Sequence, residues 1–215
     1  VSITPTYCAF DSSGNLYVTE QSFHRVKKIT PDGIVSVFIG AAGTSGSTIA
    51  STLESSSLNT PRGIKIDSSN NIYIIQNNGI RKITSAGVMT DYLPPSTFGS
   101  ATNIGISSSG GLYICNTGCV YSHIGSLQYF VGNSQTANSS IVNNDIFVTV
   151  KALVCDDSGN LYAINSNGYI IKTTPNWTIA YNGTSSTYTN VTKIAYYNGY
   201  IYGADPIAHV IRKMA

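Results

Sequence analysis

Short apolar stretches alternate with turn-forming residues along this chain, and one arrangement of the two recurs five times. It reads DSSGNLYVTE, DSSNNIYIIQ, SSSGGLYICN, DDSGNLYAIN and, one residue shorter, YNGYIYGAD. Each copy contains a tyrosine directly after an apolar residue, and these tyrosines are 56, 40, 49 and 40 residues apart. A repeat of about 40 residues is typical of propellers, solenoids and other arrays. The repeated tyrosines are Tyr17, Tyr73, Tyr113, Tyr162 and Tyr202.

The first unit shows the expected plan of one repeat. Its apolar stretches are short and alternating, and they are separated by residues typical of tight turns, such as the Asp-Ser-Ser-Gly-Asn and Pro-Asp-Gly segments. Four antiparallel strands joined in this way form one propeller blade, which cannot bury both of its faces alone. The strands of the first unit are expected at Tyr7–Phe10, Leu16–Thr19, Arg25–Ile29 and Ile34–Ile39.

Two long stretches resemble NHL repeats: AFDSSGNLYVTEQSFHRVKKITPDGIVSVFIG and NTPRGIKIDSSNNIYI. The Gly-, Ser- and Thr-rich connection between them, GAAGTSGSTIASTLESSSLNTPRGI, resembles the family as well, and the resemblance covers nearly the whole chain. It implies an all-β fold, here a five-bladed β-propeller of four-stranded antiparallel blades. We predict a single domain over residues 1–215, with blades at about 6–40, 61–94, 101–132, 150–182 and 191–215 plus 1–4.

The last blade is expected to be incomplete, because too few residues remain after Tyr202 to form a full set of strands. Either the N-terminal segment Val1–Thr4 adds a short closing strand to it, or the edge along His209–Lys213 stays open. An open strand edge presents unpaired backbone groups that can pair with another chain. Self-association through this edge is therefore one of the predicted contacts of the protein.

Composition and charge narrow the classes of function. Asp, Glu, Lys and Arg make up 10% of the chain, against roughly 25% in an ordinary soluble domain, and Ser, Thr, Asn, Gly and Tyr take their place. This favours an extracellular, cell-surface or viral protein. The net charge of +2 provides no strong field for nucleic acid or anionic lipid. No apolar run approaches the roughly 20 residues that span a bilayer, and VSITPTYCAF lacks the features of a signal peptide.

One polar residue follows the second strand of every repeat, and these residues are expected at one mouth of the central channel. Basic residues precede the first strand in two repeats and are expected at the same mouth. Together they could bind a metal ion, an acidic group or a sugar. The candidate ligand-binding residues are Glu20, Arg62, Gln76, Asn116, Lys151, Asn165 and Asp205.

The alternative interpretation of these residues is structural, and we favour it. In the NHL pattern the acidic residue caps the loop that follows it. His24 and His209 each lie four positions beyond an acid, Glu20 and Asp205. This regularity indicates a structural hydrogen bond inside each blade. The Asp that opens the turn in three repeats is likewise expected to accept backbone N–H groups of its own turn; these are Asp11, Asp67 and Asp156.

Three functions remain to be weighed. A metal-dependent hydrolase or lyase would use Glu20 and Asp205 at the channel mouth, but the chain has only three histidines and no recognisable nucleophile–base spacing. On this ground we predict no catalytic residue, metal or cofactor.

Some NHL domains bind RNA, and basic residues do recur on the third strand. Sequence-specific RNA binding usually needs exposed aromatic residues as well, so binding of nucleic acid is not the favoured function. The third-strand basic residues are Arg25, Lys27, Lys28, Arg81, Lys82, Lys172, Arg212 and Lys213.

The favoured function is a non-catalytic binding or scaffolding module that engages a protein or a carbohydrate. Two long connections, Gly40–Thr60 and Gly132–Thr149, are expected to cover the face that carries the polar mouth. Loops held on a rigid scaffold often carry recognition, and Ser, Thr and Asn side chains suit contacts with sugars or peptides. A partner is therefore expected to bind at the face formed by these inter-blade connections.

The four cysteines give two separate expectations. Cys8 and Cys155 occupy positions that hold apolar residues in other repeats, so both are expected to be buried. Cys115 and Cys119 flank a three-residue turn, so they could form a disulfide across the hairpin or remain two free thiols.

Overall fold

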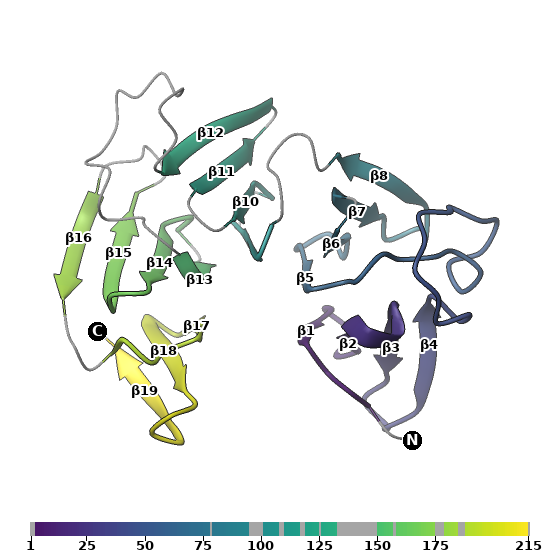
Figure 1. The fold of residues 1–215 in the computed structure, drawn as a ribbon, viewed down its shortest axis with the longest axis horizontal. Coiled ribbons are helices and arrows are strands. Elements are labelled where there is room, and N and C mark those ends of the chain that lie inside the picture. Colours follow the sequence, from purple (N-terminus) through teal and green to yellow (C-terminus); the bar gives the residue numbers. More distant parts are fainter. Residues whose placement is uncertain are drawn as a thin grey trace. The chain divides into compact units, whose positions relative to one another are not determined.

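The computed structural model describes residues 3–77, 79–94, 101–107, 110–116, 119–124, 126–132, 150–156, 158–174, 179–184 and 188–214. The chain divides into two compact units, Val1–Ala101 and Thr102–Ala215. Within the described residues the secondary structure is all β, apart from a single 3-10 turn at Gln21–Phe23 (η1). The strands form five antiparallel sheets, numbered here blades 1 to 5 in chain order (Figure 1).

The first unit contains blades 1 and 2, and each has four strands joined in sequence order. Period-2 alternation and turn chemistry predicted the four strands of blade 1 to within one residue at each end, because both signals are local. Blade 1 consists of β1 (Tyr7–Phe10), β2 (Leu16–Glu20), β3 (Arg25–Ile29) and β4 (Val35–Ile39), and blade 2 of β5 (Gly63–Ile66), β6 (Ile72–Gln76), β7 (Gly79–Ile83) and β8 (Met89–Leu93).

The second unit contains blades 3, 4 and 5. Blade 3 consists of β9 (Asn103–Ile106), β10 (Leu112–Cys115), β11 (Cys119–Ile124) and β12 (Ser126–Gly132). Blade 4 consists of β13 (Val150–Cys155), β14 (Leu161–Asn165), β15 (Tyr169–Thr173) and β16 (Ile179–Thr184). Blade 5 has three strands, β17 (Lys193–Tyr197), β18 (Tyr200–Asp205) and β19 (Val210–Met214).

The incomplete last blade is confirmed. In the described part of the chain, the sheet of blade 5 ends at β19, and Ile3 and Thr4 belong to no strand. Val1 and Ser2 lie outside the described residues. Two β-branched side chains of this edge strand are exposed, with 44% of Val210 and 69% of Ile211 open to solvent.

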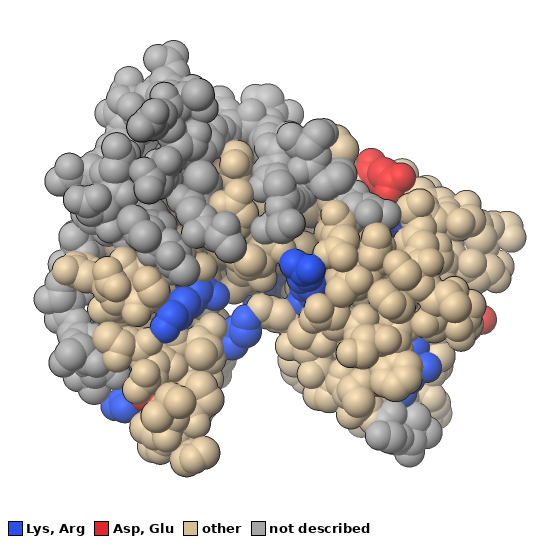
Figure 2. Space-filling model, viewed as in Figure 1, with Lys and Arg blue, Asp and Glu red and all other residues tan. Residues whose placement is uncertain are grey.

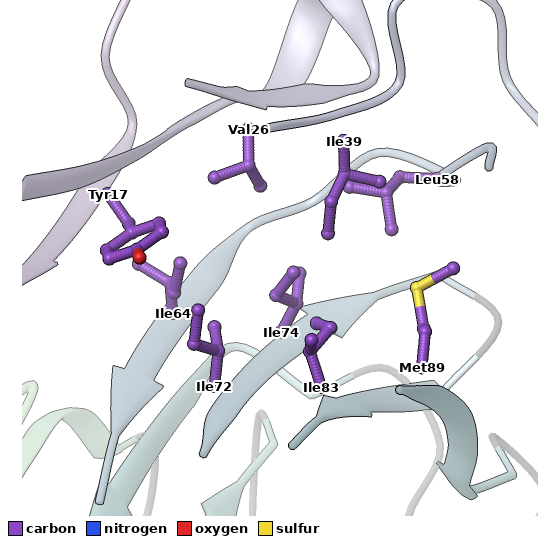
Figure 3. Packing of buried hydrophobic residues seen from close by; sticks show 9 residues of the cluster. All are labelled: Tyr17, Val26, Ile39, Leu58, Ile64, Ile72, Ile74, Ile83 and Met89. Atoms are coloured by element: carbon purple, nitrogen blue, oxygen red, sulfur yellow. The ribbon is translucent and has the colours of Figure 1, made fainter. Parts of the chain in front are cut away.

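The core of the first unit lies between the sheets of blades 1 and 2 (Figure 3). Val26 and Ile39 of blade 1 pack against Ile74 and Ile83 of blade 2. Strand β6 is buried along its whole length, which explains why its sequence is a nearly continuous run of apolar residues rather than an alternating one. Leu58, from the connection between the two blades, completes the cluster. The inter-blade connection therefore contributes to the core.

The turns of the repeat are held by their aspartates, as predicted. Asp11 Oδ1 accepts hydrogen bonds from the backbone N–H groups of Ser13 and Asn15, both at 2.9 Å. Asp67 and Asp156 make the equivalent pairs of bonds in blades 2 and 4. These bonds replace backbone partners that a tight turn cannot supply, so the aspartates stabilise the turn.

The expectation for Cys8 is wrong, because this residue is exposed. On β1 the half-buried residues Tyr7 and Ala9 pack against the core, and strand alternation turns Cys8 to the other face. Cys155 is half-buried. Cys115 is a buried free thiol, and burial raises its pKa to about 11. The side chain of Cys119 lies outside the described residues.

Charges are sparse on the surface. Figure 2 shows Lys and Arg (blue) and Asp and Glu (red) as small separate spots on the viewed face. The part of the chain that the structure describes holds no helix long and apolar enough to cross a membrane.

Candidate functional site

Glu20, the last residue of β2, is fully buried and surrounded by donors. Its carboxylate forms ion pairs with Arg25 at 2.5 Å and with Lys27 at 3.4 Å, and it accepts the backbone N–H of Thr4 at 2.8 Å. Burial alone would raise the pKa of Glu20, but the hydrogen bonds from Arg25 and Thr4 and the two nearby positive charges outweigh it and lower the pKa. The group is an ionised structural carboxylate.

Asp205 occupies the same repeat position at the end of β18, and its carboxylate is also fully engaged. Its Oδ1 accepts backbone N–H groups from Ile207 at 3.1 Å and from Ala208 at 2.9 Å. Its Oδ2 pairs with Arg212 at 2.7 Å. The hydrogen bond from Ala208, followed by the bond and charge of Arg212, lowers the pKa of Asp205. Asp205 therefore caps the loop that follows it, as the structural interpretation predicted.

At the repeat position that ends the second strand, the length of the side chain decides which backbone N–H groups it accepts hydrogen bonds from. The shorter Asn165, like Asp205, caps its own loop, accepting from the N–H groups of Asn167 and Tyr169 at 3.0 Å. Glu20 and Gln76 are one methylene longer, and they bond instead to the segment that enters the blade. Gln76 Oε1 accepts from the Asn59 backbone N–H at 3.0 Å. The difference between Asp or Asn and Glu or Gln is the signal that our sequence interpretation missed.

The predicted role of His24 inside its blade needs correction. His24 accepts a hydrogen bond through Nδ1 from the backbone N–H of Thr60, at 3.0 Å, so it links blade 1 to the connection that enters blade 2. Glu20, its expected partner, bonds to Arg25 instead. Both His24 and His209 adopt positive φ angles, 49° and 56°. Each ends the loop after the second strand, where the chain must reverse tightly.

The remaining candidates differ in how their side chains are used. Lys151 donates from Nζ to the carbonyl of Thr189 at 2.6 Å. Asn116 is half-buried at the end of β10. Arg62 is half-buried, and its backbone N–H donates to the carbonyl of Ile75 at 2.9 Å. Within the first unit the structure thus brings Arg62 beside Gln76. The gathering of all seven candidates at one channel mouth stays a prediction.

The basic residues of the third strand are not a free surface stripe. Lys27 and Arg81 are buried. In three blades a lysine lies over the ring of the repeat tyrosine, which is its direct partner on the neighbouring strand, at 5.0–5.7 Å from the ring centre. Such cation–π contacts stabilise the sheet. The pairs are Lys28–Tyr17, Lys82–Tyr73 and Lys172–Tyr162.

The connection Gly40–Thr60 contacts both the predicted mouth and the core of the first unit: its Asn59 donates a backbone N–H to Gln76 Oε1, and Leu53 and Leu58 pack with the core cluster. Its place over the face that carries the polar mouth stays a prediction. The buried guanidinium of Arg81 on β7 donates to the carbonyls of Ser47 and Ser57. Within the connection, Thr48 and Ser57 are joined by two further hydrogen bonds. The other long connection falls almost wholly on residues 133–149, outside the described residues.

Among the described residues, no group of three or more His, Cys, Asp or Glu side chains lies close enough to hold a metal ion. No known family model matches the sequence, and no curated protein matches it significantly.

Solved structures do match, and the following three do so at low sequence identity. Virginiamycin B lyase from Staphylococcus aureus, crystallised with quinupristin, aligns with a TM-score of 0.65 at 16% identity, over 96% of this chain and 68% of the lyase. A chain of the nidogen/laminin complex aligns with a TM-score of 0.73 at 14% identity, over 98% of this chain and 75% of that one. A protein provisionally assigned as a gluconolactonase aligns with a TM-score of 0.63 at 12% identity, over 92% of this chain and 70% of that protein. The chain has the β-propeller fold.

Proposed function

We propose that this chain is a non-catalytic binding propeller with NHL-type repeats, which engages a protein or carbohydrate partner through the face formed by its inter-blade connections. The observation that carries the proposal is that both acids of the candidate site, Glu20 and Asp205, are ion-paired to an arginine of their own blade. The partners described above for these two carboxylates are all groups of the fold itself. These carboxylates hold strands and loops in place.

The connection Gly40–Thr60 supports a role in recognition. It is anchored by Arg81 and by the burial of Leu58, yet it exposes hydroxyl side chains such as those of Thr44, Ser47 and Ser51. A loop that is already ordered loses less conformational entropy when a partner binds. An extracellular, cell-surface or viral location fits the low charge of the chain, and the open edge of β19 offers a place for self-association.

The alternative, a metal-dependent hydrolase or lyase, draws on the likeness to a lyase and a provisional lactonase. At 12–16% identity that likeness speaks for the fold, and one fold hosts unrelated functions. The nidogen/laminin likeness is no more specific, although it comes from a complex between proteins. The ion pairs of Glu20 and Asp205 therefore favour the binding role.

Glycan and peptide arrays probed with labelled protein test the proposal. Ligands found there should lose affinity for a Thr44→Arg/Ser51→Arg variant, which adds two bulky charges to exposed positions of the connection. The matched control is Ser13→Arg/Ser69→Arg, which adds the same charges to exposed turns at the other end of the blades. Equal loss of binding in both variants, or in neither, would count against recognition by this face.

A further inference from the structure

Two buried hydrogen-bond donors of blade 2 have neither a hydrogen-bond acceptor nor an ion pair among the described residues. They are Nε of Arg62 and Nε2 of Gln76. Gln76 is 3% exposed, whereas Arg62 is half-buried, so the corner reaches solvent at Arg62. We propose that Arg62 and Gln76 form a binding site for a carboxylate group of the partner. The site rests on the proposed binding role, because it assigns one part of the partner's chemistry.

The two side chains belong to one corner of the fold. The backbone N–H of Arg62 bonds to the carbonyl of Ile75, the residue directly before Gln76. The side-chain amide of Gln76 in turn accepts from the N–H of Asn59, three residues before Arg62. The Gln76 amide therefore lies against the same short segment that carries Arg62. A carboxylate, with about four lone-pair sites on its two oxygens, can accept from both donors.

Blade 2 is distinctive at this corner. The corresponding polar side chains of the other blades are satisfied by the fold: Glu20 and Asp205 by their arginines, and Lys151 by the carbonyl of Thr189. Blade 2 has the neutral Gln76 where blades 1 and 5 have an acid, and it adds the charge of Arg62 beside it, with which no carboxylate of the described residues forms an ion pair. The buried Nε of Arg62 likewise has no hydrogen-bond acceptor in the described residues.

The corner is also held in a strained conformation. Thr60 has a φ of 55°, which is a genuine outlier for a β-branched residue. Its N–H is held by His24 Nδ1, and the adjacent Asn59 is tied to Gln76 and to Asn77. Unfavourable backbone geometry persists where surrounding contacts enforce it, and it clusters at binding sites. The contacts around Thr60 thus fix the segment on which Arg62 is presented.

Charge selects the ligand class. The corner combines the single positive charge of Arg62 with the neutral amide of Gln76, so a monoanion compensates it. The guanidinium edge pairs with a carboxylate through two parallel hydrogen bonds. A phosphate group carries nearly twice that charge at neutral pH. A ligand with an uncharged amide would leave the positive charge of Arg62 uncompensated. The carboxylate can come from an acidic side chain of a protein or from a uronic acid of a glycan, and both present the same group.

Nuclear magnetic resonance of the 15N-labelled chain tests the site directly. The Nε–H signal of Arg62 is assigned by its loss in Arg62→Met. This signal and those of the Gln76 amide are followed while N-acetylglutamate α-amide or glucuronate is added. Sodium chloride keeps the ionic strength constant throughout. We expect saturable shifts of both signals, with weaker binding of N-acetylglutamine α-amide and inorganic phosphate. The tighter of the two carboxylates identifies a protein or a glycan as the source.

Variants connect the shifts to the proposed contacts. Arg62→Met should weaken carboxylate binding by at least about tenfold, since it removes a charge-assisted pair, and Arg62→Lys should give an intermediate loss. Lys82→Met, which removes a cation of the same blade that lies over the ring of Tyr73, should leave the affinity unchanged. Circular dichroism confirms that each variant is folded. Absence of saturable shifts, equal affinity in Arg62→Met, or tighter binding of phosphate would overturn the assignment. Partner binding lost only in the connection variant would still support the proposed function.

Discussion

The hydroxyl of Tyr17 donates a hydrogen bond to Asp11 Oδ2 at 3.2 Å, joining the two residues that define the repeat. The same carboxylate holds the turn through its other oxygen. The tyrosine and the turn therefore act as one structural element, repeated in three blades. The equivalent bonds are Tyr73 to Asp67 at 3.1 Å and Tyr162 to Asp156 at 3.2 Å.

Replacing Tyr17 by Phe should therefore destabilise the protein. Hydrogen bonds from Asn15 and Ser13 outweigh the effect of burial and lower the pKa of Asp11, so the lost bond is one to a charged acceptor, worth about 1.5–3 kcal/mol. Urea unfolding measures the change. Tyr202→Phe is the matched control, since its blade has no aspartate in the corresponding turn, and it should change stability by no more than about 0.5 kcal/mol. Equal effects of the two substitutions would rule out the Tyr–Asp bond as the cause.

Glu20→Gln should cost about 3–5 kcal/mol, because it leaves the charge of the buried Lys27 without its carboxylate. The dependence of the protein's stability on pH should change too. The folded protein lowers the pKa of Glu20, so this residue contributes stability above the ordinary carboxyl pKa of about 4, and the contribution is lost as the pH falls through the lowered value.

Unfolding free energies measured between pH 7 and pH 3 check this point. The difference between the wild type and Glu20→Gln should shrink as the pH falls. Glu54→Gln removes an exposed acid from the same unit and serves as the control. A difference that stays constant with pH would mean that the ion pairs of Glu20 contribute nothing to stability.

The rule of side-chain length predicts the effect of Gln76→Asn. The shorter amide cannot reach the N–H of Asn59, so one buried hydrogen bond is lost, at about 1–3 kcal/mol. Amide hydrogen exchange should quicken at Asn59. Asn165→Gln is the reverse change in blade 4, and faster exchange is expected there at Asn167 and Tyr169. Unchanged protection of all three amides would show that length does not select the partner.

Arg81→Met should release the connection Gly40–Thr60 from β7. The substitution removes the donors to the carbonyls of Ser47 and Ser57 while keeping most of the side chain's apolar volume. Limited proteolysis should then cleave within the connection at least several times faster. Lys82→Met, next to it on the same strand, should leave the cleavage rate unchanged. Cleavage that is slow in both variants would mean that other contacts hold the connection.

The sequence predicted the parts of this fold that depend on local chemistry. Turn residues and period-2 patterns located the strands, and the short tail after Tyr202 predicted the three-stranded blade 5. The burial of Arg81 could not be predicted, because its acceptors lie 24–34 residues earlier in the chain. The two bonding patterns of the candidate site could have been predicted, since Glu20 and Gln76 differ in length from Asn165 and Asp205.

The central claim is that Glu20 and Asp205 serve the fold and not the partner. The most direct test is the affinity of Glu20→Gln and of Asp205→Asn for a ligand found on the arrays, at a temperature at which circular dichroism shows both variants folded. We predict dissociation constants within about threefold of the wild type, a difference of less than 1 kcal/mol, together with lower melting temperatures. A folded variant of normal stability that loses its ligand would contradict the claim.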